Sequence, residues 1–373
     1  MTIVLEIYII VCILLLLFDI AFLVLKNSKN KHLHAEDGAF KKLLQQEIEL
    51  YRQNGAFSEK FVNDLPGKLS RTTHMLSLQA VLEEDPDARS WFREFLFAQI
   101  GNYQKKPEYV QAFYTYLIST LDYRKEKVPA AFSSEFMHFL ESKSLYTFTN
   151  TMDAFYAFGE THLLLQALEV VDRRSGFYHH KLLVDGLLSF QGDHEELEEA
   201  LLARFSQYGD DVKECLLDYF RMQGCEVSDL CLKLMREEKA DAEVQYRAMR
   251  YFQKFPCGEA KEWFLQILQR ENVIWIKQML AIQGLQNYDD AEVRAAVKKK
   301  ITSRDWHVRN NAVAFLHRKG LERAELQELL HLQDRYANES LLYQYKEDAE
   351  TSAFIMDTIR MLEQEKTAAG QPV

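Results

Sequence analysis

The sequence DWHVRNNAVAFL, residues 305–316, decides the fold. It places Val308, Ala312 and Leu316 four residues apart, which is the spacing of one buried helix face. The same three positions recur when the chain is stepped back by 32 residues, four times over. They hold Ile276, Leu280 and Gly284; Val244, Ala248 and Phe252; Val212, Leu216 and Phe220; and His180, Val184 and Leu188. All but two of these positions are apolar, so the sequence predicts stacked helices with a period of about 32 residues.

The repeat pattern has limits at both ends. It continues upstream through Phe148, Met152 and Tyr156, fails at Tyr116 and Arg124, and also fails downstream of the last repeat. Atypical end units are expected, because they must cover the open core of a stacked array. Between the matched helices, second helices are predicted at residues 194–205, 227–235, 260–268, 291–301 and 323–332. Each repeat is therefore predicted to be a helical hairpin.

At these residues the chain resembles the HEAT-repeat family. The family motif has an Asp followed, three and four residues later, by Val-Arg and then by Ala and Leu. It is present as Asp305, Val308, Arg309, Ala312 and Leu316; as Asp241, Val244, Ala248 and Phe252, with Gln245 in place of Arg; and as Asp290, Val293, Arg294 and Val297. The resemblance covers residues 145–335 well and 38–144 only in general pattern. Tetratricopeptide repeats fit less well, because their 34-residue period and signature residues are absent.

The resemblance implies roles for two motif residues. The Asp caps a helix, and the Arg pairs with carboxylates of the adjoining repeat. The units at Lys181 and Lys213 hold Phe177 and Gly209 where the motif has Asp, so their helix caps are expected to differ.

The N-terminal residues predict a membrane anchor. Residues 3–25 are apolar apart from Glu6 and Asp19, and a helix of this length reaches roughly 34 Å, enough for a hydrocarbon core of about 30 Å. No Lys or Arg precedes the segment and no A-x-A-like cleavage site follows it, so an anchor fits better than a cleaved signal peptide. Lysines directly after the segment, beginning at Lys26, place the rest of the chain in the cytoplasm by the positive-inside rule.

Asp19 lies within this predicted span. A carboxyl at this depth is costly, at about 2–3 kcal/mol on insertion scales. One interpretation is a contact with a polar group on a partner's transmembrane helix. The alternative is a protonated or water-reaching Asp19 in a span that is hydrophobic enough to tolerate it.

The predicted fold is all-α. It consists of an N-terminal transmembrane helix followed by a right-handed α-solenoid of HEAT-like helical hairpins, and the low content of 14 Gly and 6 Pro agrees with it. The predicted segments are an anchor at 1–25, a polar linker at 26–37, a degenerate helical part at 38–144, HEAT-like repeats at 145–335, capping helices at 336–362 and a disordered tail at 363–373.

Patterns of catalytic or metal-binding residues are sparse. No phosphate-binding, dinucleotide-binding, zinc-protease or serine-hydrolase motif occurs. The single His194-Glu195 dipeptide cannot assemble the di-iron site of HEAT-like hydroxylases, and His179-His180 fits a capping or surface role. The five cysteines form no CxxC pair. The sequence therefore predicts no catalytic residue, no metal ligand and no cofactor.

One segment of the chain is strongly basic, although the whole chain has a net charge of −11. That overall charge argues against general nucleic-acid binding. The candidate partner-binding residues are Arg294, Lys298, Lys299, Lys300, Arg304, Trp306, Arg318 and Lys319. Such a patch can bind an acidic protein surface or anionic lipid headgroups. The alternative is a solvated helix face, with Arg309 already used between repeats.

The sequence thus predicts a non-enzymatic, single-pass protein of the cell membrane, whose cytoplasmic HEAT-like scaffold binds a membrane-associated protein. Aromatic residues such as Tyr246 and Trp306, which flank motif positions, are candidates to line the binding surface. No small-molecule substrate is indicated. The alternatives are a HEAT-like enzyme, either an iron hydroxylase or a DNA glycosylase, and a protein that assembles only with itself.

Overall fold

The computed structural model describes residues 38–121, 123, 127–174 and 179–368. Helices joined by short loops make up this part of the chain, and no strand occurs in it. The prediction of an all-α fold built from many packed helices is confirmed.

The fold class is corrected in one respect. No helix of the described ranges is long and apolar enough to cross a membrane. Even the 20-residue α21 (Ala349–Ala368) carries charged residues such as Asp357 and Glu363 along its length. The predicted span at 1–25, with Asp19, and the linker at 26–37 lie outside the described residues. The fold is therefore all-α without a membrane-spanning helix among its described elements.

The chain divides into two compact units, Met1–Arg204 and Phe205–Val373. The helices that precede and follow residue 145, where the regular repeats are predicted to begin, pack closely on one another within the first unit.

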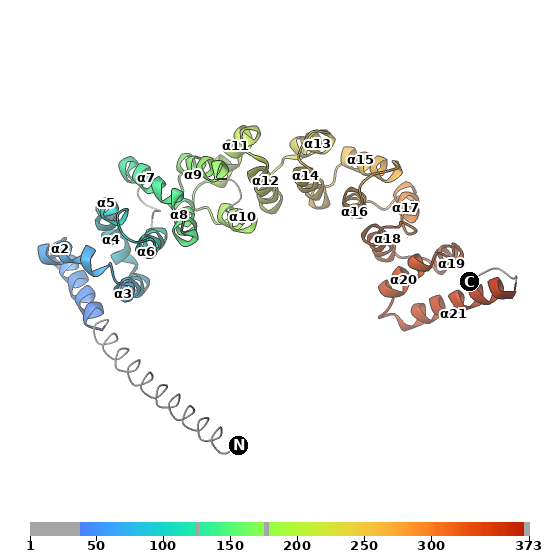
Figure 1. Cartoon of the computed structure of the whole chain (residues 1–373), viewed down its shortest axis with the longest axis horizontal. Coiled ribbons are helices and arrows are strands. Elements are labelled where there is room, and N and C mark those ends of the chain that lie inside the picture. Colours follow the sequence, from blue (N-terminus) through green and yellow to red (C-terminus); the bar gives the residue numbers. More distant parts are fainter. Residues whose placement is uncertain (1–37, 122, 124–126, 175–178, 369–373) are drawn as a thin grey trace, which may run out of the picture. The chain divides into compact units, whose positions relative to one another are not determined.

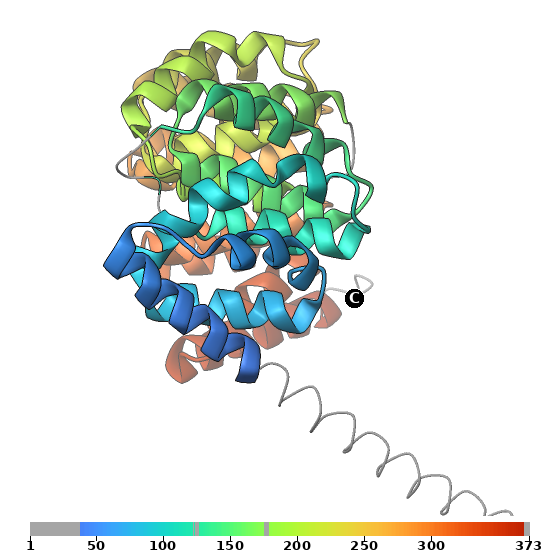
Figure 2. The same cartoon turned by 90° about the vertical axis from the view of Figure 1, so that its left-hand side faces the viewer.

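The first unit is a stack of helices. Residues 38–54 are helical, followed by α2 (Glu59–Lys68), α3 (Thr72–Glu84), α4 (Pro86–Ala98), α5 (Ile100–Tyr103), α6 (Glu108–Ser119), α7 (Ala130–Phe136), η1 (Met137–Glu141), α8 (Leu145–Phe158), α9 (Thr161–Arg173), α10 (His180–Leu188) and α11 (His194–Arg204). Helix α8 packs on both α6 and α10, and α9 packs on α11. Figure 2 shows the unit in blue and green, with most helix axes roughly parallel.

The upstream failure of the repeat pattern has a structural reason. Thr147 and Asn150 of α8 donate side-chain hydrogen bonds to the carbonyl oxygens of Glu108 and Ala112 on α6. The bonded residues are 39 and 38 positions apart. The helices still stack, but the connection is longer than 32 residues, so a fixed 32-residue step from α8 misses the matching face of α6.

The second unit consists of helical hairpins arranged in two layers. Its elements are η2 (Phe205–Gln207), α12 (Asp210–Gln223), α13 (Ser228–Arg236), α14 (Ala242–Lys254), α15 (Gly258–Gln269), α16 (Trp275–Gly284), η3 (Leu285–Asn287), α17 (Ala291–Lys298), α18 (Trp306–Arg318), α19 (Arg323–His331), α20 (Arg335–Gln344) and α21. Helices α12, α14, α16, α18 and α20 pack each on the next and form one layer (Figure 1). In the other layer α15 packs on α17, and α19 on α21. The predicted second helices all occur, within a few residues of the expected bounds.

The predicted repeat positions lie in the core. All of them are buried except His180, Leu188 and Ile276, which are half-buried. The upstream extension through Phe148, Met152 and Tyr156 is also buried. The 32-residue pattern therefore identifies the faces on which successive helices stack.

The predicted Asp caps are present. Asp241, Asp290 and Asp305 each precede a helix, and each accepts a hydrogen bond from a backbone N–H of its first turn, at 2.8, 3.1 and 2.8 Å. Where the motif lacks Asp, His179 Nδ1 accepts from the backbone N–H of Lys181 at 3.2 Å. At α12 the cap is Gly209, and Asp210 and Asp211 supply negative charge in the first turn instead.

The array also continues past the last predicted repeat. Helix α20 packs on α18 as the next matched helix, but polar residues occupy the expected apolar positions. The buried Ser340 hydroxyl accepts from Arg309 Nε at 3.3 Å, and Gln344 donates to Asn310 Oδ1 at 3.3 Å. Helix α21 then extends to Ala368, into the segment that the sequence predicts to be a disordered tail.

Gly284 breaks the apolar pattern because the neighbouring hairpin helix leaves no room for a side chain. A Cβ atom on Gly284 would lie 2.3 Å from the ring of the fully buried Phe264 on α15. The absence of a side chain thus lets α15 and α16 approach closely.

We expect Gly284→Ala to lower the free energy of unfolding by about 1–3 kcal/mol, because a methyl group would overpack a core that cannot yield. The measurement is urea unfolding followed by circular dichroism. Gly258→Ala is the matched control, since a Cβ there meets nothing within 4 Å. Adding Phe264→Leu should restore part of the loss; equal stability of Gly284→Ala and wild type would contradict the packing.

Candidate protein-binding surface

Two residues of the predicted basic patch are held in ion pairs. Lys298 Nζ lies 2.8 Å from Glu325 and 3.5 Å from Glu328, both on α19. Arg294 Nε lies 2.9 Å from Asp289, and its Nη1 lies 3.8 Å from Glu325. These carboxylates offset much of the local positive charge, and they link α17 to α19.

The hydrogen bond between Lys298 and Glu325 is the largest cause of the raised pKa of Lys298 and of the lowered pKa of Glu325. The sign of each pKa shift defines the pH range in which this ion pair stabilises the fold. Its contribution is present at neutral pH and is lost as the pH falls through the lowered pKa of Glu325 or rises through the raised pKa of Lys298.

The remaining predicted cations differ in their exposure and in their contacts. Lys299 and Arg304 are exposed, as is Arg318, which donates to the Ala314 carbonyl oxygen. Half-buried Lys300 has a pKa lowered by burial. Lys319 Nζ lies 5.9 Å from the ring centroid of Phe315. Of the predicted cations, Arg294 and Lys298 are therefore engaged in ion pairs, whereas Lys299, Arg304 and Arg318 are exposed.

Arg309 has a structural role that differs from the one implied by the HEAT resemblance. Its guanidinium is buried and donates to the Ser303 carbonyl oxygen at 2.7 Å as well as to Ser340. It also lies over the ring of Tyr336, 5.2 Å from the centroid. Arg309 thus reaches the adjoining repeat through a hydroxyl and an aromatic ring, whereas Arg294 reaches a carboxylate there.

Large apolar and aromatic side chains lie at the starts of three successive stacked helices, at the N-cap or the first two residues, and most of them are exposed. We call this group the aromatic ridge: Ile274 and Trp275 at α16, Trp306 and His307 at α18, and Tyr336 at α20. Ile274, Trp306 and Tyr336 are 51 %, 54 % and 58 % exposed. Trp275 stacks on His307 with ring centroids 4.6 Å apart, and Trp306 meets His307 edge-on at 4.9 Å.

Local structure explains why these side chains point outward. Asp305 and Asp334 cap α18 and α20, so each helix begins at a defined residue. In α18 the buried face begins at Val308, the third residue of the helix. Side chains at the first two positions therefore lie before the packed face and project from the end of the helix layer.

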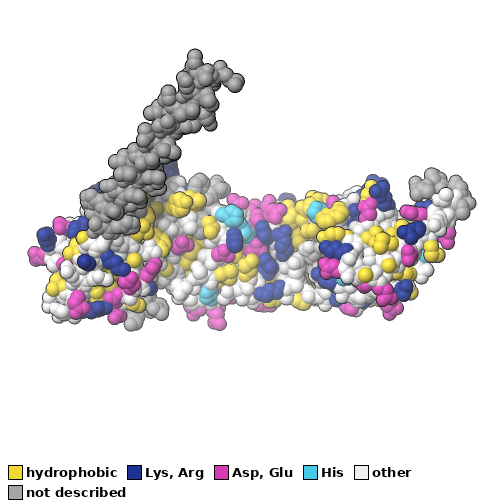
Figure 3. All heavy atoms as spheres, turned by 90° about the horizontal axis from the view of Figure 1, so that it is seen from below, with side chains coloured by type: hydrophobic (Ala, Val, Ile, Leu, Met, Phe, Trp, Pro, Cys, Tyr) yellow, Lys and Arg dark blue, Asp and Glu magenta, His cyan; other side chains and the backbone are white. Residues whose placement is uncertain are grey.

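The ridge is a surface of a kind that binds proteins. Single exposed apolar residues are common, but contiguous groups of them mark interaction sites. Trp, Tyr and Arg are the residue types that most often dominate binding energy at protein interfaces. Figure 3 shows hydrophobic side chains exposed in groups between charged ones on the face seen from below.

The sequence identified part of this surface. Trp306 is exposed as expected, but Tyr246, the other suggested aromatic, is buried between helices. Trp275, His307 and Tyr336 were not predicted. The available signal was an aromatic residue immediately after a helix start in consecutive repeats.

Other candidate chemistry is not assembled in the described ranges. No group of three or more His, Cys, Asp or Glu side chains there is placed to hold a metal ion. The thiols of Cys215, Cys225 and Cys231 are buried and form no disulfide with the described residues, and burial raises the pKa of the Cys215 thiol to about 12. His179 has the capping role that the sequence suggested.

Comparison with known proteins gives no assignment: no family model matches the chain, and no curated protein matches it. The helical-repeat architecture is therefore inferred from the packing of the helices and from the 32-residue pattern of apolar residues.

We expect Lys298→Glu to lower the free energy of unfolding by about 1 kcal/mol, because it would place like charges beside Glu325 and Glu328. Lys299→Glu is the control, since Lys299 is exposed and makes no ion pair with the described residues; its effect should stay within about 0.5 kcal/mol. Urea unfolding at low and high salt checks both, and the difference should shrink at 1 M salt. Equal losses in the two variants would contradict the ion-pair arrangement.

Proposed function

We propose that the chain is a HEAT-like helical-repeat scaffold that binds a protein partner through the aromatic ridge. The observation that carries this proposal is the exposure of Ile274, Trp306 and Tyr336 on three successive repeats, at equivalent ends of stacked helices. The motif residues Asp241, Asp290 and Asp305, which cap their helices, support the HEAT-like assignment.

The ridge is preorganised for binding. Trp275 and His307 hold one another in a stacked pair, and Arg309 fixes the Tyr336 ring from below the surface. Rigid aromatic side chains lose little conformational entropy when a partner covers them. A partner can therefore gain apolar contact area without ordering this surface first.

The class of partner is a protein surface or segment with apolar side chains that can cover the ridge. The predicted preference for a membrane-associated partner depended on residues 1–37, which lie outside the described part, and it is not included in this proposal. Mechanistically, the stacked helices present the ridge on a fixed frame, and specificity comes from the spacing of the aromatic side chains along the array.

We expect the double variant Trp306→Ala, Tyr336→Ala to lose partner binding by roughly ten-fold or more, which is about 1.4 kcal/mol, because it removes two exposed anchors. The measurement is affinity purification of the full-length protein from its host with quantitative mass spectrometry. Titration of the purified partner against each variant follows.

Tyr343→Ala is the matched control. Tyr343 is a 57 % exposed tyrosine on the same helix as Tyr336 but outside the ridge. Thermal unfolding of all variants should change little, because the removed rings are exposed. A partner that binds the ridge variant and the control with equal affinity would show that the ridge is not the binding surface.

A further inference from the structure

Helices α6 and α8 of the first unit begin side by side. Thr147, near the start of α8, donates its hydroxyl to the carbonyl oxygen of Glu108, the first residue of α6. One turn further along both helices, Asn150 donates to the carbonyl oxygen of Ala112 at 2.8 Å. The two helices are therefore parallel, and their first residues lie at the same end of the packed pair.

Helix α10 continues this arrangement, and Figure 1 shows α6, α8 and α10 following one another in one layer. The backbone N–H of Gln191, just after α10, donates to the carbonyl oxygen of Tyr156 near the end of α8, at 3.0 Å. Arg174, which precedes α10 in the chain, donates to the carbonyl oxygen of Ser142 at 2.7 Å and lies 4.7 Å from the ring centroid of Phe148. The starts of the three helices therefore share one edge of the first unit.

Large apolar and aromatic side chains are exposed at this edge. Tyr109 and Tyr146, the second residues of α6 and α8, are 57 % and 77 % exposed. Leu145 and Leu182, at the starts of α8 and α10, are also exposed. A ring that is 77 % exposed touches few atoms of its own fold, so Tyr146 projects from the surface.

Basic side chains accompany these apolar ones. Residues 104–109, 141–146, 172–174 and 180–182 carry six Lys or Arg and three Asp or Glu, a local net charge of +3 in a chain of −11. The basic residues are Lys105, Lys106, Lys143, Arg173, Arg174 and Lys181, and the acidic ones are Glu108, Glu141 and Asp172. Lys105, Lys143 and Lys181 are exposed, and none of the four lysines forms an ion pair with a described residue. We call the four lysines, Tyr109, Leu145, Tyr146 and Leu182 the basic edge.

This combination is complementary to the surface of an anionic bilayer. Tyrosine rings are enriched at the depth of the lipid headgroups, where the ring meets apolar chains and the hydroxyl meets water. Lysines near such a surface are attracted by the negative lipids, and binding strength grows with both this attraction and the apolar area inserted. A protein partner would need a matching hollow for each projecting ring, whereas lipid headgroups rearrange around it.

We propose that the basic edge binds the surface of an anionic membrane. Tyr109 and Tyr146 insert among the headgroups, and the exposed lysines pair with the negative groups of the lipids. This contact requires no membrane-spanning helix. It is also independent of the aromatic ridge, because all residues of the ridge belong to the second unit.

The test is hydroxyl-radical footprinting of the full-length protein, read by mass spectrometry. The protein is mixed with vesicles of phosphatidylcholine alone or with about 30 % phosphatidylserine. Oxidation of Tyr146 should fall by about three-fold or more on the anionic vesicles relative to the neutral ones. This protection should weaken at about 0.5 M salt, because salt screens the attraction.

Two comparisons make the result specific. Tyr343, an equally accessible tyrosine of the second unit at 57 % exposed, should be oxidised alike on both vesicle types. Both vesicle types have the same apolar interior, so insertion of any other apolar segment affects both measurements in the same way.

Charge-reversal variants complete the test. The triple variant Lys105→Glu, Lys143→Glu, Lys181→Glu should lose the difference between the two vesicle types. The matched control makes the same change of charge at three exposed lysines of the second unit, Lys233→Glu, Lys239→Glu and Lys299→Glu, and should keep the protection of Tyr146. Circular dichroism of both variants should match that of the wild type, because the substituted side chains are exposed.

Two results would overturn the proposal. One is equal oxidation of Tyr146 on neutral and anionic vesicles, or undiminished protection in the triple variant of the basic edge. The other is protection of Tyr146 by a purified partner protein but not by anionic vesicles, which would make the edge a protein interface. Neither result bears on the aromatic ridge, since Trp306 and Tyr336 are unchanged in every variant of this test.

Discussion

A single helical hairpin of this chain cannot bury its own apolar face, and the second unit exists because each hairpin uses its neighbour for that purpose. Val244, Ala248 and Phe252 of α14 are buried between α12 and α16, and equivalent residues of the other stacked helices are buried in the same way. Stability is then a sum of contacts between adjacent repeats. This constraint explains why one pattern of apolar residues recurs at a nearly fixed interval.

Polar side chains fix how neighbouring repeats align. Arg247 of α14 lies 2.7 Å from the buried Asp218 of α12, and Gln283 of α16 bonds to both Gln253 and Asn311 on the helices beside it. Because buried polar groups must find partners, these links penalise sliding of one helix along the next. Apolar contacts supply the attraction, whereas the hydrogen bonds and ion pairs select one register.

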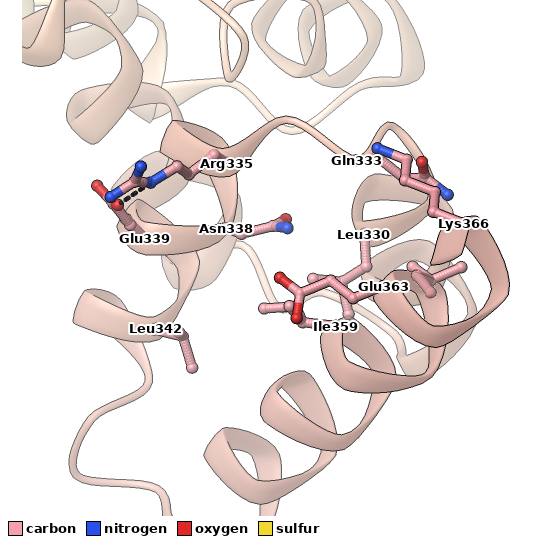
Figure 4. A pocket seen from close by; sticks show the side chains of 10 residues that line it. Leu330, Gln333, Arg335, Asn338, Glu339, Leu342, Ile359, Glu363 and Lys366 are labelled. Carbon is pink, nitrogen blue, oxygen red and sulfur yellow. Dashed lines mark hydrogen bonds and ion pairs between the residues drawn. The ribbon is translucent and has the colours of Figure 1, made fainter. Parts of the chain in front are cut away.

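The same packing determines which residues remain for binding. Side chains at the first two positions of a stacked helix lie before its buried face, so aromatic residues there, such as Trp306 and Tyr336, are left exposed. On α20 the face that does not pack on α18 borders a space beside α21, which Leu342 and Ile359 help to line (Figure 4). The aromatic ridge thus arises where the packed face of each stacked helix has not yet begun.

The sequence by itself determined the helical class, the repeat interval, the second helices and the Asp caps, because these depend on periodicity and on contacts within a few residues. It did not determine which cations of the basic segment are held in ion pairs, since Lys298 and its partner Glu325 lie on different helices. Nor did it separate buried Tyr246 from exposed Trp306. Only the tertiary structure decided these points, because burial and ion pairing depend on which faces the neighbouring helices cover, and a single helix's pattern does not record its neighbours.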